Sequence, residues 1–315
     1  MIQVCGAKYV VFGVSDPEKT SKFMTDFGLA PTARNGGSAY FRGALAAPYL
    51  YVAEKSQTPA LKAVGLALKS ADDLAKAARI EGASAIRDLD RPGGGQVVDV
   101  VLPGGVRIEL VHGIADAAPL PVRPPLAVNE GQRKTRFNVP QRPPRIPAQI
   151  LKLGHVVLGV PDPVAAKDWA VRNLGMIVSD ALLVPGSKDE YLAFFMRCDL
   201  GSTPADHHCL LVTKSDVPGV HHVAFEVQDI DTVFMGHEWM RSTPHRPHWG
   251  VGRHVLGSQV FDYWWDPDGF RMEHYADGDL YDNQVPMTTV EATHEQLWTW
   301  GPEVPATFFQ QTREP

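Results

Sequence analysis

The sequence predicts an α+β protein that is built from four copies of a βαβββ module and arranged as two tandem domains. One observation behind this prediction is an internal repeat, in which KYVVFGVSDP (8–17) corresponds to GHVVLGVPDP (154–163). The other is a second repeat, in which VVDVVLPGGVRIELV (97–111) corresponds to FDYWWDPDGFRMEHY (261–275). Both repeats occur in the same order in each half. The two halves are therefore expected to have the same order of strands and helices.

Each element of the module has its own sequence signal. The first repeat has a strand rich in β-branched residues, an Asp-Pro pair that starts a helix, and a glycine where the helix ends. Residues 65–83 and 221–240 show a second strand that leads into a second helix. The other repeat shows two strands joined by a tight Pro/Gly turn. The predicted modules span about 7–54, 64–113, 154–213 and 220–276.

A connector separates the two halves. Residues 114–149 are rich in proline and arginine and have no hydrophobic period, so we expect either a solvated linker or a subunit contact there. The sequence therefore predicts an N-terminal domain at 1–113, a C-terminal domain at 150–280 and a C-terminal tail at 281–315.

Composition argues against several classes of function. The net charge is −6 without a long run of lysine and arginine, which argues against a nucleic-acid partner. No stretch reaches eighteen consecutive apolar residues, and the first residues lack the features of a signal peptide, so we expect a cytoplasmic protein with no membrane partner. The three cysteines have no CxxC spacing and are expected to be reduced thiols.

Comparison of the two halves identifies candidate functional residues. The repeat pairs Tyr9 with His155, Gly65 with His222, and Glu109 with Glu273. Two neutral imidazoles and one carboxylate on one face of a metal ion leave three positions open, which is typical of oxygen-activating Fe(II) sites. Such an ion keeps a charge of about +1, which a singly ionised catechol neutralises as it chelates the ion. The C-terminal domain is therefore predicted to be catalytic and metal-binding, and the N-terminal domain to be a scaffold without a metal site.

The three candidate ligands lie in GHVVLGV, GVHHVAFEV and DPDGFRMEHYADGD. With these motifs the chain resembles the type I extradiol ring-cleavage dioxygenases of the vicinal oxygen chelate superfamily, from residue 7 to about residue 280. The resemblance implies a curved mixed sheet that forms a half-open barrel in each domain. It also implies His155, His222 and Glu273 as the ligands of Fe(II), O₂ as a co-substrate, and assembly into a homo-oligomer.

Three further residues match the motifs of this family. They are His208 in DHHCLLV, His254 in GVGRHVLGS and Tyr263 in FDYW. The resemblance implies that His208 transfers protons during the reaction, a role that suits an imidazole. It also implies that His254 and Tyr263 form hydrogen bonds to the substrate oxygens and orient the bound diol. His248 and Trp249 are close to His254 in sequence, and we expect them to line the same cavity and bind substrate.

The expected reaction is ring cleavage of a catechol in the catabolism of aromatic hydrocarbons. The run from Gly252 to Asn283 resembles a subgroup that includes trihydroxytoluene oxygenases. A single-ring catechol that is substituted or carries a third hydroxyl group is therefore the expected substrate.

Several alternatives stay open at this point. An enzyme similar to 4-hydroxyphenylpyruvate dioxygenase also uses two histidines and a glutamate on iron, and a glyoxalase-type isomerase or a metal-free ligand-binding protein is compatible with the same fold. Manganese is an alternative to iron, because both metals favour these ligands. His207 competes with its neighbour His208 for the proton-transfer role. His221 competes with His222 as a ligand, and the alignment with GHVVL favours His222.

Overall fold

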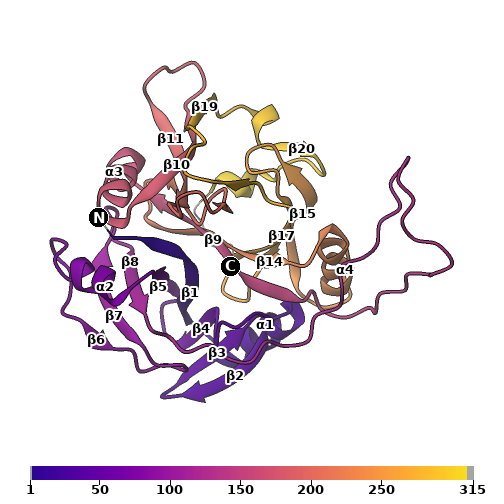
Figure 1. Cartoon of the computed structure of the whole chain (residues 1–315), viewed down its shortest axis with the longest axis horizontal. Helices are drawn as coiled ribbons and strands as arrows, with labels where there is room; N and C mark the ends of the chain where they lie inside the picture. The colour runs from indigo at the N-terminus through magenta and orange to yellow at the C-terminus, as the bar shows by residue number, and fades with distance from the viewer. Residues whose placement is uncertain (1, 311–315) are drawn as a thin grey trace.

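The computed structural model describes residues 2–310, which form two large β-sheets that lie side by side (Figure 1). The described residues contain four α-helices, and the order of elements repeats βαβββ four times, with one additional two-residue strand in the third module. Both sheets contain parallel and antiparallel pairs. The predicted α+β fold of four modules is therefore confirmed.

The first two modules form an eight-stranded sheet of order β2-β3-β4-β1-β5-β8-β7-β6. Its strands are β1 (Val4–Val14), β2 (Ala30–Asn35), β3 (Ser38–Arg42), β4 (Tyr51–Lys55), β5 (Ala60–Leu68), β6 (Arg87–Asp88), β7 (Gln96–Val101) and β8 (Arg107–His112). The helices α1 (Pro17–Phe27) and α2 (Ala71–Ala77) follow the first strand of each module.

The last two modules and part of the predicted tail form a ten-stranded sheet of order β19-β10-β11-β13-β9-β14-β17-β16-β15-β20. Its strands are β9 (Ile150–Val160), β10 (Met176–Leu183), β11 (Tyr191–Cys198), β13 (Leu210–Lys214), β14 (Gly219–Val227), β15 (Arg246–His254), β16 (Val260–Trp265), β17 (Arg271–Ala276), β19 (Thr288–Glu291) and β20 (Trp298–Trp300). A separate pair joins β12 (Ala205–Asp206) to β18 (Leu280–Tyr281). The helices are α3 (Pro163–Leu174), α4 (Ile230–Arg241), and the 3₁₀ turns η1 (His294–Gln296) and η2 (Ala306–Phe309).

The Asp-Pro and glycine signals act as the sequence predicts. The side chains of Asp16 and Asp162 cap the first turns of α1 and α3 by accepting hydrogen bonds from backbone N–H groups. Gly28 (φ 112°) and Gly175 (φ 68°) end these helices in the left-handed region, where a side chain would be strained. These two glycine C-caps end the helices and let the chain turn back toward the sheet.

The register of the strands corrects one pair in the alignment of the two halves. Gly65 lies opposite both Tyr9 and Glu109, whereas the residue opposite both His155 and Glu273 is Ala224. Gly65 therefore corresponds to Ala224, and the counterpart of His222 is Ala63, two residues earlier on β5. Its methyl side chain is buried in an apolar cluster with Tyr9.

An arginine fills the place in the first half that corresponds to the ligand cluster of the second. Glu109 is fully buried, and its carboxylate accepts hydrogen bonds from the Tyr9 hydroxyl (2.5 Å) and from Arg91 Nη1 (2.5 Å), with Arg107 Nη2 3.1 Å away. The Arg91 guanidinium also lies over the Tyr9 ring. Burial opposes ionisation of Glu109, but the hydrogen bonds and charge of Arg91 hold its pKa below the ordinary value. The buried carboxylate of this half is thus neutralised by side chains.

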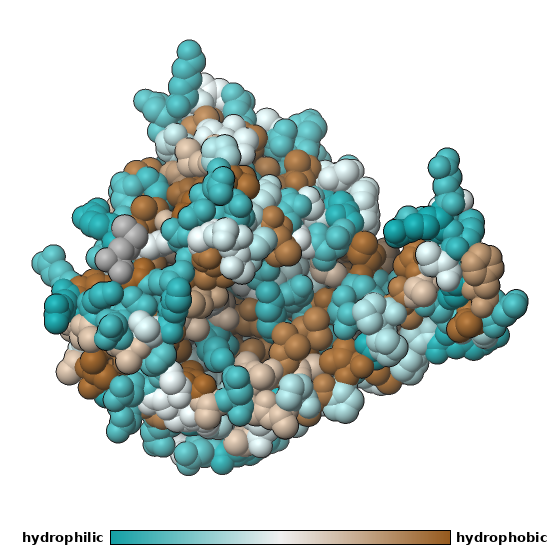
Figure 2. Space-filling view, viewed as in Figure 1, coloured by the Kyte–Doolittle hydropathy of each residue, from teal (hydrophilic) through white to brown (hydrophobic). Residues whose placement is uncertain are grey.

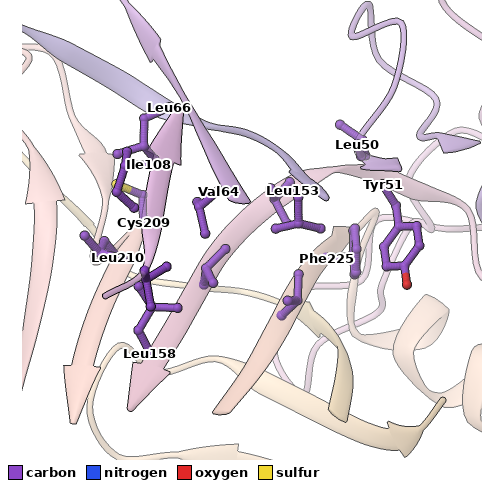
Figure 3. Packing of buried hydrophobic residues seen from close by; sticks show 14 of the residues in the cluster. Leu50, Tyr51, Val64, Leu66, Ile108, Leu153, Leu158, Cys209, Leu210 and Phe225 are labelled. Carbon is purple, nitrogen blue, oxygen red and sulfur yellow. The ribbon is translucent and has the colours of Figure 1, made fainter. Parts of the chain in front are cut away.

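The two halves share one apolar core. Figure 3 shows Val64, Leu66 and Ile108 of the first sheet packed close to Leu153, Leu158, Leu210 and Phe225 of the second. The His274 ring stacks on Phe27 of α1, and its Nε2 donates a hydrogen bond to the carbonyl of Phe27 (2.6 Å). Because the first strands of the two halves also contact each other, the scaffold sheet supports the strands that carry the candidate site.

The connector projects from the body as an arm (Figures 1 and 2). Asn129 Oδ1 accepts hydrogen bonds from the backbone N–H groups of Thr135 and Arg136, which closes the end of the arm into a loop. The described part of the chain has no helix that is long and apolar enough to span a membrane.

Candidate metal centre and catalytic site

Three adjacent strands place the candidate ligands on one face of the second sheet. His155 on β9 and Glu273 on β17 both lie opposite Ala224 on the strand between them, β14. His222 is two residues before Ala224, and side chains two residues apart on a strand point to the same face. The sheet therefore brings two imidazoles and a carboxylate together from positions far apart in the sequence.

The ligand atoms form a nearly equilateral triangle. His155 Nε2 lies 3.3 Å from Glu273 Oε2 and 3.3 Å from His222 Nε2, and His222 Nε2 lies 3.2 Å from the same carboxylate oxygen. An ion about 2.2 Å from each of two adjacent octahedral ligands separates them by about 3.1 Å. The edges of the triangle therefore fit one face of an octahedral metal ion.

The environment of Glu273 also favours a cation at this place. Its carboxylate is fully buried, and neither oxygen has a hydrogen-bond partner with good geometry among the described residues. An ionised carboxylate without compensation is costly in the interior of a protein, so a bound cation explains its retention here.

A second histidine and a backbone carbonyl orient the imidazole of His222. His221 Nε2 lies 2.6 Å from the carbonyl oxygen of Phe308, and His221 Nδ1 lies 2.7 Å from His222 Nδ1. Since a carbonyl only accepts, His221 Nε2 donates, and its Nδ1 accepts from His222 Nδ1–H. This leaves the Nε2 lone pair of His222 facing the carboxylate. Burial lowers the pKa of His222 to about 4, which keeps the imidazole neutral.

His208 lies beside the triangle, and its neighbour His207 points away from it. The ring centroid of His208 is 4.1 Å from that of His155, and His208 lines the cavity in front of the candidate ligands. His207 instead contacts Asp180, with 2.7 Å between its Nε2 and Oδ2 of the carboxylate. Burial lowers the pKa of His208 well below the ordinary value, so its imidazole is neutral. The geometry favours His208 over His207 for proton transfer.

His254 and Tyr263 form a hydrogen-bonded pair beside His222, whose ring centroid is 5.2 Å from that of Tyr263. His254 Nδ1 donates to the carbonyl of Leu297 (2.8 Å), which leaves its Nε2 to accept a hydrogen bond from the Tyr263 hydroxyl (2.9 Å). Both residues line the cavity. Burial and the charge of Glu273 raise the pKa of Tyr263 well above the ordinary value, so the phenol keeps its proton and remains a donor.

The expectation that His248 and Trp249 line the cavity is wrong. Trp249 is buried behind Tyr263 and Phe308, with ring centroids 5.8 Å and 4.9 Å away, and its indole N–H donates to the carbonyl of Pro302. The His248 ring packs against Trp265 at 4.5 Å, and its Nε2 lies 3.1 Å from the Thr307 hydroxyl. Tyr263 and Phe308 stand in front of them, so these two residues support the wall without forming its surface.

The cavity has a volume of about 430 Å³ and a mostly apolar wall. Its apolar surface includes Leu182, Phe195, Leu211, Leu297, Phe308 and Phe309. Among the described lining residues the only lysine or arginine is Lys214, whose amine is 2.8 Å from Glu190 Oε1. The candidate ligands therefore face a mostly apolar cavity, and the one lysine that lines it, Lys214, already forms an ion pair with Glu190.

The sequence did not identify three contributors to the site. From sequence, His207 and His221 are only competitors of His208 and His222, whereas in the structure the two members of each His-His doublet contact each other. The tail sequence has no pattern that predicts a contact with the site, yet the carbonyls of Leu297 and Phe308 accept hydrogen bonds from His254 and His221. Tail residues therefore complete the site.

Comparison with known proteins agrees with this geometry. No family model matches the chain. Metapyrocatechase 2 of Cupriavidus necator is 36% identical over 162 residues, which cover 51% of this chain and 48% of that protein. The match therefore spans about half the length of this curated relative.

Solved structures resemble the chain over nearly its whole length. The Mn(II)-bound glyoxalase from Novosphingobium aromaticivorans has a TM-score of 0.82 at 23% identity, with 100% of this chain and 97% of that chain covered. Homoprotocatechuate 2,3-dioxygenase from Brevibacterium fuscum, in complex with 3,4-dihydroxyphenylacetate, has a TM-score of 0.79 at 20% identity, with 99% and 93% covered. The 2,3-dioxygenase LapB from Pseudomonas sp. KL28 has a TM-score of 0.75 at 18% identity, with 92% and 98% covered. The chain therefore has the fold that glyoxalases share with extradiol dioxygenases, as the sequence predicts.

Proposed function

We propose that the chain is an extradiol dioxygenase, which uses Fe(II) and O₂ to cleave the aromatic ring of a catechol. The observation that carries the proposal is the triangle of His155, His222 and Glu273 in an apolar cavity beside a neutral imidazole. When bound there, Fe(II) supplies a Lewis acid with open positions for the diol and for O₂. The similarity to metapyrocatechase 2 supports the same reaction class.

The side chains around the triangle have separate tasks in this proposal. His208 accepts a proton from the catechol as it binds and returns one when the ring opens, because its imidazole is neutral and faces the cavity. Tyr263 gives its one hydroxyl proton to His254 Nε2, so its oxygen accepts a hydrogen bond from the remaining hydroxyl of a singly ionised catechol and orients the substrate. The apolar wall excludes water from the ring.

The cavity favours a single-ring catechol with an uncharged substituent. A substrate carboxylate would meet leucine and phenylalanine side chains, and burial of an unpaired carboxylate is costly. Lys214 does not compensate, because Glu190 already pairs with it. Alkyl and hydroxyl substituents meet no such penalty.

Oxygen uptake after anaerobic loading with Fe(II) tests both the reaction and the substrate class. We expect uptake with a coloured ring-opened product from methylcatechols or trihydroxybenzenes. We expect kcat/KM for 3,4-dihydroxyphenylacetate to be at least about 10-fold lower, which corresponds to 1.4 kcal/mol. Loading with Mn(II) in parallel compares the two candidate metals. Absence of uptake with every catechol in iron-loaded protein would refute the proposal, and a preference for the charged substrate would refute the assigned class.

A glyoxalase-type isomerase is the second candidate function, because the Mn(II)-bound glyoxalase has the same fold over the whole chain. Isomerisation needs no O₂, so turnover of a glutathione hemithioacetal under anaerobic conditions would distinguish it. The donor set favours the dioxygenase, since one carboxylate and two histidines form the metal cluster among the described residues.

We also propose that the protein is a homo-oligomer to which the arm contributes. Phe137, Val139 and Val128 on the arm are 70%, 63% and 57% exposed, although apolar side chains gain stability from burial. Residues 114–149 hold six arginines and lysines and two acidic residues, whereas the whole chain has a net charge of −6. The arm of one copy is therefore complementary in charge to the body of another.

Sedimentation velocity tests this assembly. We expect the wild-type protein to sediment as an oligomer and Phe137→Asp with Val139→Asp to shift it toward smaller species. A substitution at an exposed position of the body, Val101→Asp, serves as the control. A monomeric wild-type protein would rule out the assembly.

A further inference from the structure

Asp180, His207 and His208 form a continuous chain of contacts that ends at the cavity. His207 Nε2 lies 2.7 Å from Asp180 Oδ2, and His207 Nδ1 lies 3.0 Å from His208 Nδ1. The three residues are 5%, 1% and 3% exposed, so they depend on one another for hydrogen bonds. Only His208 lines the cavity.

The acceptor at the end of this chain of contacts relates the positions of the protons to one another. An ionised carboxylate only accepts, so His207 Nε2–H donates to Asp180. When His207 carries a single N–H, that N–H is used by Asp180, and His207 Nδ1 accepts from His208 Nδ1–H. His208 Nε2 is then left without a proton. We propose that Asp180 and His207 are positioning residues that hold His208 in the tautomer whose Nε2 accepts a proton from the substrate.

The backbone of His207 is held firmly enough for this task. Its N–H donates to the carbonyl of Asp279 (2.9 Å), and its carbonyl accepts from the Ser179 hydroxyl (2.6 Å). Arg197 Nη1 in turn donates to that hydroxyl (2.9 Å). Gly257, at a φ of 77°, packs so closely that a Cβ would lie 3.1 Å from His207 Nδ1. The imidazole therefore has one well-defined place.

The His221–His222 doublet has the same contact between Nδ1 atoms but ends at a different kind of acceptor. His221 and His222 also contact each other through their Nδ1 atoms, but the terminal acceptor there is the uncharged carbonyl of Phe308. A carboxylate stabilises the positive charge that a pair of imidazoles gains with a proton, whereas a carbonyl does so only weakly. The charged acceptor thus lies behind the imidazole that takes up protons, and the neutral one behind the candidate ligand.

A double-mutant cycle tests whether Asp180 acts through His208. The inference rests on the proposed dioxygenase function, so kcat and KM for a catechol are measured in the iron-loaded protein. We expect Asp180→Asn to lower kcat by about 10- to 100-fold with unchanged KM and iron content, the usual scale for a residue behind a functional imidazole. In the His208→Ala background the same substitution should have almost no effect.

Asp26→Asn is the matched control, because Asp26 also accepts from an imidazole, His245 at 2.8 Å, but lies outside the cavity. We expect it to leave kcat unchanged. His207→Phe removes the acceptor and keeps an aromatic ring, so it replaces Asp180→Asn if that variant does not fold. An equal loss of kcat in both backgrounds would show a merely structural role and overturn the proposal, as would the absence of any loss.

Histidine ¹⁵N NMR spectra of the Zn(II)-loaded protein give a readout that does not depend on turnover. We expect His208 to be protonated on Nδ1 and His207 on Nε2, with both signals assigned from the His208→Ala and His207→Phe spectra. Protonation of His208 on Nε2 would overturn the proposal. If the wild-type protein binds iron but never consumes O₂, the proposed dioxygenase function is refuted. The inference about Asp180 and His207 is then still tested, because the NMR spectra report the tautomer of His208 without turnover.

Discussion

Glu273→Gln is expected to abolish ring cleavage because the protein no longer retains its metal. The amide keeps the shape of the side chain but removes the only negative charge among the three candidate ligands. We expect the metal content after desalting to fall below about a tenth of an equivalent per chain, as measured by elemental analysis. Oxygen uptake should fall with it. Iron retained at one equivalent would contradict the assignment of Glu273.

Glu109→Gln is the matched control, since it changes the corresponding buried carboxylate of the other half. Its partners are Arg91, Arg107 and Tyr9, and loss of one member of a buried ion pair costs about 3 kcal/mol of unfolding free energy. We expect urea denaturation to show this loss while the metal content stays unchanged. Glu273→Gln should therefore affect metal binding, and Glu109→Gln should affect stability alone. Iron incorporation that depends on Glu109 would refute the hypothesis that only the C-terminal half binds metal.

His208→Ala is expected to slow turnover by about 10²- to 10⁴-fold while the metal stays bound. His208 lines the cavity but is not part of the ligand triangle, so its loss removes proton transfer and leaves the three candidate ligands in place. Single-turnover kinetics together with elemental analysis measure the two effects separately. Added imidazole should restore part of the rate, because the truncated side chain leaves room for it.

His112→Ala provides the comparison for this variant. His112 ends β8 in the first sheet, where its Nδ1 lies 3.3 Å from the carbonyl of Leu68, and it does not line the cavity. We expect its rate to equal that of the wild type. An unchanged rate in His208→Ala would exclude His208 from proton transfer.

The sequence predicted the fold because the module is repeated, and each copy reinforced the signals of the others. The strand of Tyr9 and the strand of His155 occupy the same place in their sheets, as their motifs indicated. The same periodicity caused the misalignment of Gly65 with His222. Side chains alternate with a period of two, so a shift of two residues keeps the same face, and only the register identified Ala63.

The remaining features of the site depend on contacts that no local pattern contains. The carbonyl of Phe308 is 87 residues from His221, and that of Leu297 is 43 residues from His254. A carbonyl is present in every residue, so the sequence carries no sign of which one accepts. Trp249 was misplaced for a related reason, because its distance from His254 in sequence did not reveal that Tyr263 and Phe308 stand before it.

Arg91 has a consequence for how the chain is made. Domains of a growing chain generally fold in the order in which they are synthesised, and the half that emerges first here contains its own permanent cation. Its buried carboxylate is neutralised by side chains as soon as the β8 strand pairs, and no metal ion is needed for this. The half that is synthesised later can then pack against a folded first half, and in the proposed function its own buried carboxylate is neutralised only when a metal ion binds.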